Sequence, residues 1–139
     1  MIVVDSSAII AILFDEPSAD TLAARLSLDP DRVLSAVSYL EVGAVLAGRV
    51  NDNRHQVISD LDAFLVEARI TIAQVDAEQA RIALNARITY GRGMGHGGVL
   101  NLGDAFSYAL AKSLDAPLLY IGNDFGTTDI KSAFVSERQ

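Results

Sequence analysis

The chain has 139 residues, half of them hydrophobic, which is the size and composition of one globular domain with a buried core. Its 18 acidic residues against 11 Lys and Arg give a formal net charge of −7, which argues against a protein that binds nucleic acid through a broad basic surface. Because the chain has no cysteine, disulfide scaffolds, thiolate zinc sites and cysteine nucleophiles are excluded.

Strands and helices are predicted to alternate along the chain. The consecutive apolar residues before Asp5 are typical of a strand buried on both faces in a parallel sheet. Further strands are expected at residues 32–36, 70–75 and 117–121, with a short fifth near 133–136. Helices are expected at 6–14, 17–28, 39–50, 55–68, from 76 to the glycine-rich loop at 91–98, and at 102–114. This alternation predicts an α/β fold with a parallel sheet covered on both faces.

Two patterns predict details of the helices. Ser38-Tyr-Leu-Glu41 has the spacing of a capping box, in which two side chains satisfy free backbone N–H groups at a helix start. In the helix before the glycine-rich loop, apolar side chains at helical spacing predict a buried face made of Ala77, Ala80, Leu84 and Ile88.

No segment predicts a membrane span or an export signal. The longest uninterrupted apolar run, Ala8 to Phe14, is far shorter than the ~20 residues that a membrane-spanning helix needs. Asp5 stands where an export signal carries positive charge. We therefore expect one domain over residues 1–139, in the cytoplasm and without a membrane partner.

Four acidic residues are predicted to lie at one edge of the sheet, because ligands of parallel α/β folds bind beyond the carboxyl ends of the strands. They are Asp5, Glu41, Asp104 and Asp124. Taken singly, each has a structural explanation as a helix cap, a first-turn acid or a turn residue. Taken together, they would repel one another unless a cation neutralised them.

The chemistry of such a cluster is that of a hard divalent cation, Mg²⁺ or Mn²⁺, which prefers oxygen ligands. Such a site assists phosphodiester hydrolysis, because the cation activates water and offsets charge on a phosphoryl oxygen. A serine triad, a zinc site, a P-loop and a dinucleotide site all lack their motif or its context. The glycine-rich loop is interpreted as a flexible connection or as a substrate-side loop with Arg92 and His96.

Several segments together resemble the PIN domain and, more narrowly, the VapC-type toxins of bacterial toxin–antitoxin pairs. They are Asp5-Ser-Ser-Ala8, Ser38 with Glu41, the run from Leu100 to Lys112, and Pro117 to Phe125 with Thr128-Asp129. The resemblance covers essentially the whole chain. It implies a three-layer α/β/α fold with a central parallel sheet of four to five strands. It also implies a Mg²⁺- or Mn²⁺-dependent endoribonuclease, often a homodimer, that is neutralised by a small VapB-type antitoxin in a hetero-oligomer.

The resemblance also assigns residues. The family's acids match Asp5, Glu41 and Asp104, and the fourth matches Asp124, with Asp129 as a second candidate. Asp5, Asp104 and Asp124 are then the expected metal ligands, and Glu41 is expected to hold a water and help to remove its proton.

Two positions depart from the family pattern. Gly122 stands where many relatives have an acid or a hydroxyl, and two glycines follow His96 where relatives of this subgroup often have proline. Ser6 is a candidate partner of a carboxylate or a phosphate. The cationic candidates for phosphate binding are Arg49, Arg54, Arg92, Lys112 and Lys131.

Two other function classes stay open. One is a PIN-like chain that has lost catalysis and acts only by binding. The other is a Mg²⁺-dependent phosphoryl-transfer domain, although this chain lacks an acid two residues after Asp5 and a lysine just beyond the fourth strand. Metal titration followed by incubation with RNA distinguishes these classes from a ribonuclease.

Overall fold

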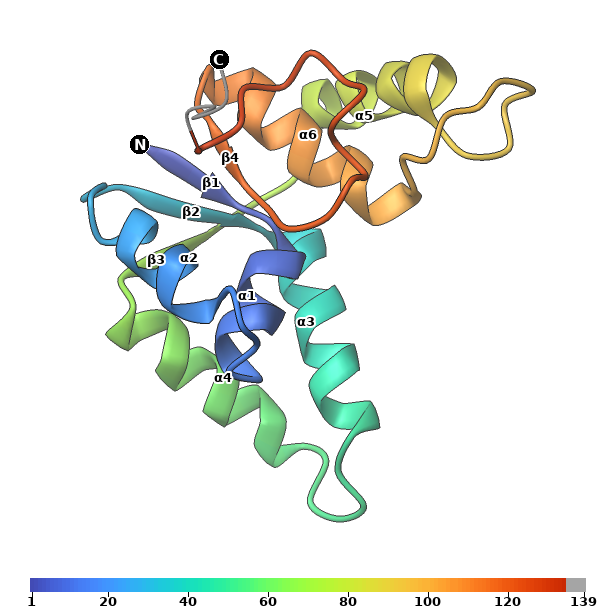
Figure 1. The fold of residues 1–139 in the computed structure, drawn as a ribbon. Coiled ribbons are helices and arrows are strands. Elements are labelled where there is room, and N and C mark those ends of the chain that lie inside the picture. Colours follow the sequence, from blue (N-terminus) through green and yellow to red (C-terminus); the bar gives the residue numbers. More distant parts are fainter. Residues whose placement is uncertain (135–139) are drawn as a thin grey trace.

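A parallel sheet of four strands, in the order β3-β2-β1-β4, forms the middle of the protein in the computed structural model (Figure 1). The structure describes residues 1–134. Along the chain, the elements are β1 (Ile2–Val4), α1 (Ser6–Leu13), α2 (Ala19–Leu26), β2 (Arg32–Ser35), α3 (Ala36–Gly48), α4 (Gln56–Glu67), β3 (Ile70–Ala73), α5 (Ala77–Tyr90), α6 (Leu102–Leu114) and β4 (Leu118–Leu119). The predicted α/β fold with a parallel sheet is confirmed.

Parallel pairings on both sides of β1 build the sheet. Val3 of β1 lies opposite Val33 of β2 and opposite Leu118 of β4, and β2 pairs in turn with β3. Of the predicted fifth strand, the structure has a single bridge between Ser132 and Leu118, and residues 135 and 136 lie outside the described part of the chain. Because the strands are parallel, their carboxyl ends meet at one edge of the sheet.

Helices on both faces of the sheet complete three layers (Figure 1). Helices α1 to α4 pack on one face, and α5 and α6 pack on the other. Ile2 and Val4 of β1 point into the first core and Val3 into the second, which is why this strand is apolar at consecutive positions. Among the helices of residues 1–134, none combines the length and the apolar character that crossing a membrane requires.

The start of α3 differs from the prediction. The helix begins at Ala36, and its cap is Ser35, whose hydroxyl accepts a hydrogen bond from the backbone N–H of Val37 (3.2 Å). The predicted capping box of Ser38 and Glu41 is therefore wrong, because an earlier serine takes the cap at the end of β2. As a result, Ser38 is buried inside the helix and Glu41 lies in its second turn.

The buried face of α5 also differs from the prediction. Leu84 and Ile88 of the predicted apolar face are 61% and 55% exposed. The face that α5 buries instead carries Gln79, Ala83 and Ala86. The small alanine side chains on this face let α5 approach α6 closely. The residues of both the predicted and the observed face follow one another at intervals of three or four positions, as on any helix face. The periodicity alone therefore did not identify the face that packs on α6.

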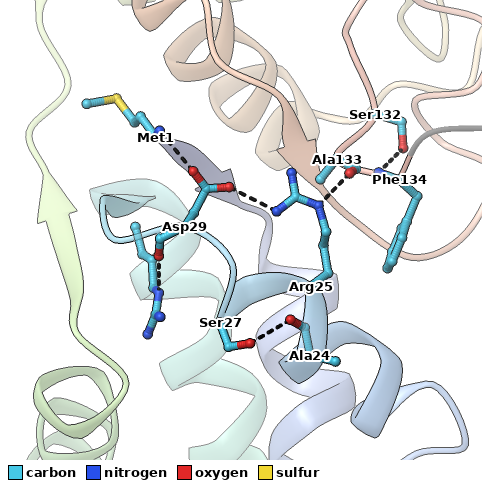
Figure 2. Close-up of polar contacts among 9 residues, drawn as sticks. Met1, Ala24, Arg25, Ser27, Asp29, Ser132, Ala133 and Phe134 are labelled. Carbon is cyan, nitrogen blue, oxygen red and sulfur yellow. Dashed lines mark hydrogen bonds and ion pairs between the residues drawn. The ribbon is translucent and has the colours of Figure 1, made fainter.

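Arg25 of α2 ties the last part of the described chain to the body of the protein (Figure 2). Its Nε donates to the carbonyl oxygen of Ala133 (2.6 Å), and its Nη1 donates to Asp29 (2.9 Å). The other carboxylate oxygen of Asp29 accepts from the amino group of Met1 (3.0 Å). The hydrogen bond from Arg25, followed by that from the amino group, lowers the pKa of Asp29. Arg25 thereby links α2 to the strand edge beside β4.

Replacing Arg25 with Gln should weaken this anchor. We expect the free energy of unfolding in urea to fall by about 1–2 kcal/mol, because two partly buried hydrogen bonds are lost. The backbone N–H of Ala133, which donates to Leu118, should then exchange faster with solvent deuterium. Arg81→Gln on the exposed surface of α5 is the control. Equal protection of Ala133 in the two variants would contradict the anchoring role.

Candidate metal centre

The four predicted acids come from four separate elements that meet at the carboxyl ends of the strands. Asp5 directly follows β1, Glu41 lies in α3, Asp104 lies in the first turn of α6, and Asp124 lies in the loop after β4. The carboxyl group of Asp104 is close to those of Asp5 and Asp124, and that of Glu41 is close to Asp5. The structure therefore brings together the acids that are far apart in the sequence, where α1, α3 and α6 begin (Figure 1).

Asp5 is buried, with 2% of its surface exposed, and its carboxylate accepts three hydrogen bonds. Its Oδ2 accepts from the backbone N–H of Ser7 (3.0 Å) and from the Ser7 hydroxyl (2.6 Å). Its Oδ1 accepts from the hydroxyl of Ser107 in α6 (2.6 Å). The bond to the Ser7 N–H confirms that Asp5 caps α1. The two hydroxyl contacts go beyond capping and fix the orientation of the carboxylate.

Asp104 is part of a complete capping box at the start of α6. The Asn101 side chain accepts from the N–H of Asp104 (2.8 Å), and Asp104 Oδ2 accepts from the N–H of Asn101 (3.1 Å). Burial raises the pKa of Asp104 to about 7, and the charges of Asp5 and Asp124 act in the same direction, while the bond from Asn101 opposes them. Asp104 therefore exchanges its proton near neutral pH.

Glu41 packs its carboxylate against the backbone of α6. A Cβ atom at Gly103 would lie inside the van der Waals radius of Glu41 Oε2, so this glycine provides the space for the acid. Glu41 Oε1 is buried and has no hydrogen-bond partner among the described residues. Burial and then the charge of Asp5 raise the pKa of Glu41, and the nearby Ser6 hydroxyl opposes this shift.

The donor set fits a hard divalent cation. All the donors that converge are carboxylate oxygens, which Mg²⁺ and Mn²⁺ prefer. The buried Oε1 of Glu41 has no partner among the described residues. Burial first and then neighbouring carboxylates raise the pKa values of Glu41 and Asp104, and a bound cation would oppose both effects. Within residues 1–134, no three Asp, Glu or His side chains are already arranged as a metal-binding group. The acids meet in pairs, so binding a cation would draw them closer together.

Of the two candidates for the fourth acid, Asp124 is the one beside Asp104. Asp129 instead accepts hydrogen bonds from the Tyr108 hydroxyl (2.6 Å) and from Lys112 Nζ (3.0 Å), and these two bonds lower its pKa. Asp129 thus holds the loop after β4 against α6. Gly122, in the loop before Asp124, has a φ of +97° that favours glycine.

Most of the candidate phosphate-binding cations have other partners. Arg49 stacks on the Phe14 ring (4.2 Å to the centroid), and Lys112 and Lys131 form ion pairs with Asp129 and Asp115. Arg54 Nε donates to the carbonyl of Val50. The remaining candidate, Arg92, is exposed in the glycine-rich loop.

His96 closes the glycine-rich loop onto α5. Its Nε2 lies 3.1 Å from the carbonyl oxygen of Ile88, and its Nδ1 accepts from the N–H of Gly98 (3.0 Å). The ring nitrogens are therefore occupied within the loop, so the structure does not support His96 as a phosphate ligand. Gly93 and Gly95 have φ values of +84° and +82°, which a loop of this shape requires.

Sequence reasoning gave no role to two residues at the site, Gly103 and Ser107, and it assigned the buried Ser38 to a helix cap. Ser38 Oγ lies 3.0 Å from Ser107 Oγ, although the two residues belong to different helices. Ser107 follows Asp104 by three positions, a spacing that places both on one side of α6 and was the only local signal available.

A family model described as the PIN domain matches residues 2–131. The chain is similar to Ribonuclease VapC28 of Mycobacterium tuberculosis, with 48% identity over 132 residues that cover 94% of this chain and 96% of the relative. It is also similar to Ribonuclease VapC42 of the same species, with 43% identity over 131 residues that cover 94% of this chain and 98% of the relative.

Among solved structures, a toxin–antitoxin complex from Klebsiella pneumoniae contains a chain with a TM-score of 0.69 to this one and 15% sequence identity. The match covers 96% of this chain and 98% of that chain. At this identity the likeness concerns the fold, and it agrees with the three-layer α/β/α architecture.

Replacing Asp104 with Asn should stabilise the metal-free protein at high pH. An acid whose pKa is raised on folding makes the folded state bind more protons than the unfolded state, so stability falls as pH rises from about 4 to 7. Asn cannot ionise and still accepts the bond from Asn101. The gain in free energy of unfolding should therefore grow from near zero at pH 4 to about 2–4 kcal/mol at pH 8.

Urea denaturation in EDTA measures this gain, with the exposed Asp52→Asn as control. A gain that does not change with pH would refute the assignment.

Replacing Gly103 with Ala should displace the Glu41 carboxylate. We expect a loss of about 1–3 kcal/mol in the free energy of unfolding, because the added methyl group overpacks the site. In a Glu41→Ala background the same change should become neutral or stabilising, since Ala is the better helix former. Gly48→Ala, at a position with open space, is the matched control. Equal effects of Gly103→Ala in the two backgrounds would contradict the contact.

Proposed function

The chain belongs to the PIN-domain family, and on this basis we propose that it is a metal-dependent endoribonuclease that acts as the toxin of a toxin–antitoxin pair. Its relatives at 43% and 48% identity, matched over almost their whole length, are named VapC ribonucleases. The observation that carries the proposal is the convergence of Asp5, Glu41, Asp104 and Asp124 at one edge of the sheet. We infer that residues 1–139 make up a single PIN domain.

Under this proposal, Asp5, Asp104 and Asp124 hold Mg²⁺ or Mn²⁺ at the sheet edge. When bound, the divalent ion supplies positive charge that offsets the charge developing on the phosphoryl oxygens. The three acids would give that ion a fixed position, because Asp5 is held by its hydroxyl contacts and Asp104 by its capping box. The negative charge of the site thus becomes a means of binding a polyanion through a cation.

Glu41 is assigned to the attacking water. Its buried Oε1 has a free acceptor position that a water hydrogen would fill. As the water oxygen bonds to phosphorus and the bond from phosphorus to the leaving oxygen breaks, Glu41 accepts the proton of the water. The raised pKa of Glu41 makes it a stronger base than an ordinary carboxylate at neutral pH. Gly103 serves this step indirectly, because it provides the space in which Glu41 lies.

RNA is the proposed substrate, on the strength of the relatives' names. Arg92 is the cation best placed to contact the phosphate backbone, because it is exposed and its backbone pairs with Leu100, just before the start of α6. With a formal net charge of −7, the chain has little basic surface for a long nucleic acid. We therefore infer that the substrate is held by the metal and by a few local contacts.

A VapB-type antitoxin is the proposed partner, in a hetero-oligomer that also contains a homodimer of this chain. A structural neighbour is a toxin–antitoxin complex. The acidic edge would attract a basic segment of such an antitoxin, which would then cover the same carboxylates that hold the metal.

Replacing Asp5 or Asp124 with Asn should lower metal-dependent RNA cleavage by about 100-fold or more, whereas Asp129→Asn should leave most of it. The purified chain is incubated with total RNA in Mg²⁺, in Mn²⁺ and in EDTA, and the new 5′ ends are sequenced. Circular dichroism verifies that the variants are folded. The Asp124 and Asp129 variants are a matched pair, because both acids lie in the loop after β4 and only Asp124 lies beside Asp104.

Each outcome separates the proposal from its alternatives. Intact RNA with a folded wild-type chain that binds Mn²⁺ would favour a PIN-like domain that acts only by binding. Phosphorylation of Asp5 without RNA cleavage would favour a phosphoryl-transfer domain. Full cleavage by Asp5→Asn would refute the assigned site.

A further inference from the structure

We propose that Ser38 and Ser107 form a buried hydroxyl relay that orients Asp5, so that this acid offers a single oxygen, Oδ1, to the divalent cation. The inference rests on the proposed function, because it concerns the same metal site. It adds two positioning residues that are not acidic and that lie on two different helices, α3 and α6.

The relay is defined by two short contacts in the interior. Ser107 Oγ lies 2.6 Å from Asp5 Oδ1, and Ser38 Oγ lies 3.0 Å from Ser107 Oγ. Both serines are fully buried, with no exposed surface. A buried hydroxyl without a partner is destabilising, so Ser38 depends on Ser107 and Ser107 depends on Asp5.

Hydrogen-bond chemistry fixes the direction of the relay. A carboxylate only accepts hydrogen bonds, so the single hydroxyl proton of Ser107 goes to Asp5. Ser107 Oγ must then be the acceptor in its contact with Ser38, and Ser38 is the donor. The relay therefore runs from Ser38 through Ser107 to Asp5, and its polarity strengthens the terminal bond.

The remaining acceptor positions on Asp5 determine which oxygen can bind a cation. An ionised carboxylate has about two acceptor positions on each oxygen. Oδ2 already accepts from the N–H and the hydroxyl of Ser7. The Ser7 hydroxyl is itself fixed, because it accepts from the N–H of Ile121 (3.1 Å). Among the residues that the structure describes, Oδ1 accepts only from Ser107, so it is the oxygen with a free position for a metal ion.

Ser107 donates from α6 to the Asp5 carboxylate and thereby opposes its rotation away from its acidic neighbours. Asp104 and Glu41 both lie close enough for their charges to interact with that of Asp5. The Ser107 proton offsets part of this repulsion and holds Oδ1 in one direction. Partners of this kind, which orient a ligand without touching the metal, typically contribute 10- to 100-fold in metal affinity.

The test measures Mn²⁺ binding to the full chain by electron paramagnetic resonance, without RNA. We expect Ser107→Ala to raise the Kd for Mn²⁺ by about 10-fold. Ser38→Ala should raise it by less, because Ser107 can still donate to Asp5. In the Ser107→Ala background, Ser38→Ala should have no further effect, since the relay is already broken. Ser107→Thr keeps the hydroxyl and should restore binding relative to Ser107→Ala.

Ser113→Ala is the matched control, because Ser113 also lies in α6 and its hydroxyl donates to the carbonyl of Leu110 within the same helix. Thermal unfolding in EDTA monitors the fold of every variant. If Ser107→Ala does not fold, Ser38→Ala and Ser107→Thr decide the question.

Three outcomes overturn the relay alone, and the first two are wild-type Mn²⁺ affinity in a folded Ser107→Ala or Ser38→Ala variant and effects of the two serines that simply add. A loss of thermal stability in EDTA without a change in Kd would also overturn it, because the serines would then serve only packing. A wild-type chain that binds no Mn²⁺ would overturn the metal site and the relay together.

Discussion

Repulsion between carboxylates is the constraint around which this structure is organised. A parallel sheet delivers Asp5, Asp104 and Asp124 to one edge, and α3 adds Glu41 from the side. In water these groups would separate, and in the folded protein burial makes their mutual repulsion more costly. The chain offsets this cost with hydrogen bonds to Asp5 and with the capping box at Asp104. None of the described residues donates a hydrogen bond to Glu41 Oε1, so the strain that remains is concentrated where the proposed chemistry takes place.

Helix α6 connects the parts of the site to one another. Its first turn carries Asp104, and its next turn carries Ser107, which reaches Asp5 across the sheet edge. Further along the same helix, Tyr108 and Lys112 bind Asp129 and so hold the loop that brings Asp124 back toward Asp104. Burial, and then the hydrogen bond to Asp129, raise the pKa of Tyr108, so its hydroxyl remains a donor throughout the physiological range. Because Glu41 also packs against Gly103 of this helix, a shift of α6 would disturb all four acids at once.

The α/β fold and the position of the four acids at one edge of the sheet were predictable, because both follow from local patterns in the sequence. Consecutive apolar residues identified β1. An acid that directly follows a buried strand of a parallel sheet lies at the edge where the carboxyl ends of the strands meet. The predictions that failed concern details of single helices, which depend on a neighbour distant in the sequence. Ser35 and Ser38 both suit a cap, and only the end of β2 decides between them. The two faces of α5 have similar spacing, and only contact with α6 identifies the buried one. Ser107 and Gly103 matter because of residues in β1 and α3, which no local pattern reveals.

The close approach of Gly103 to Glu41 has a consequence for how related chains are judged. Possession of all four acids does not ensure a competent site, because the space for one of them is set by a residue with no functional group. A chain that kept every carboxylate but carried a larger residue at this position would have to move α3 or α6 to accommodate it. At the proposed site, the smallest side chain at the edge is therefore as informative about competence as the charged ones.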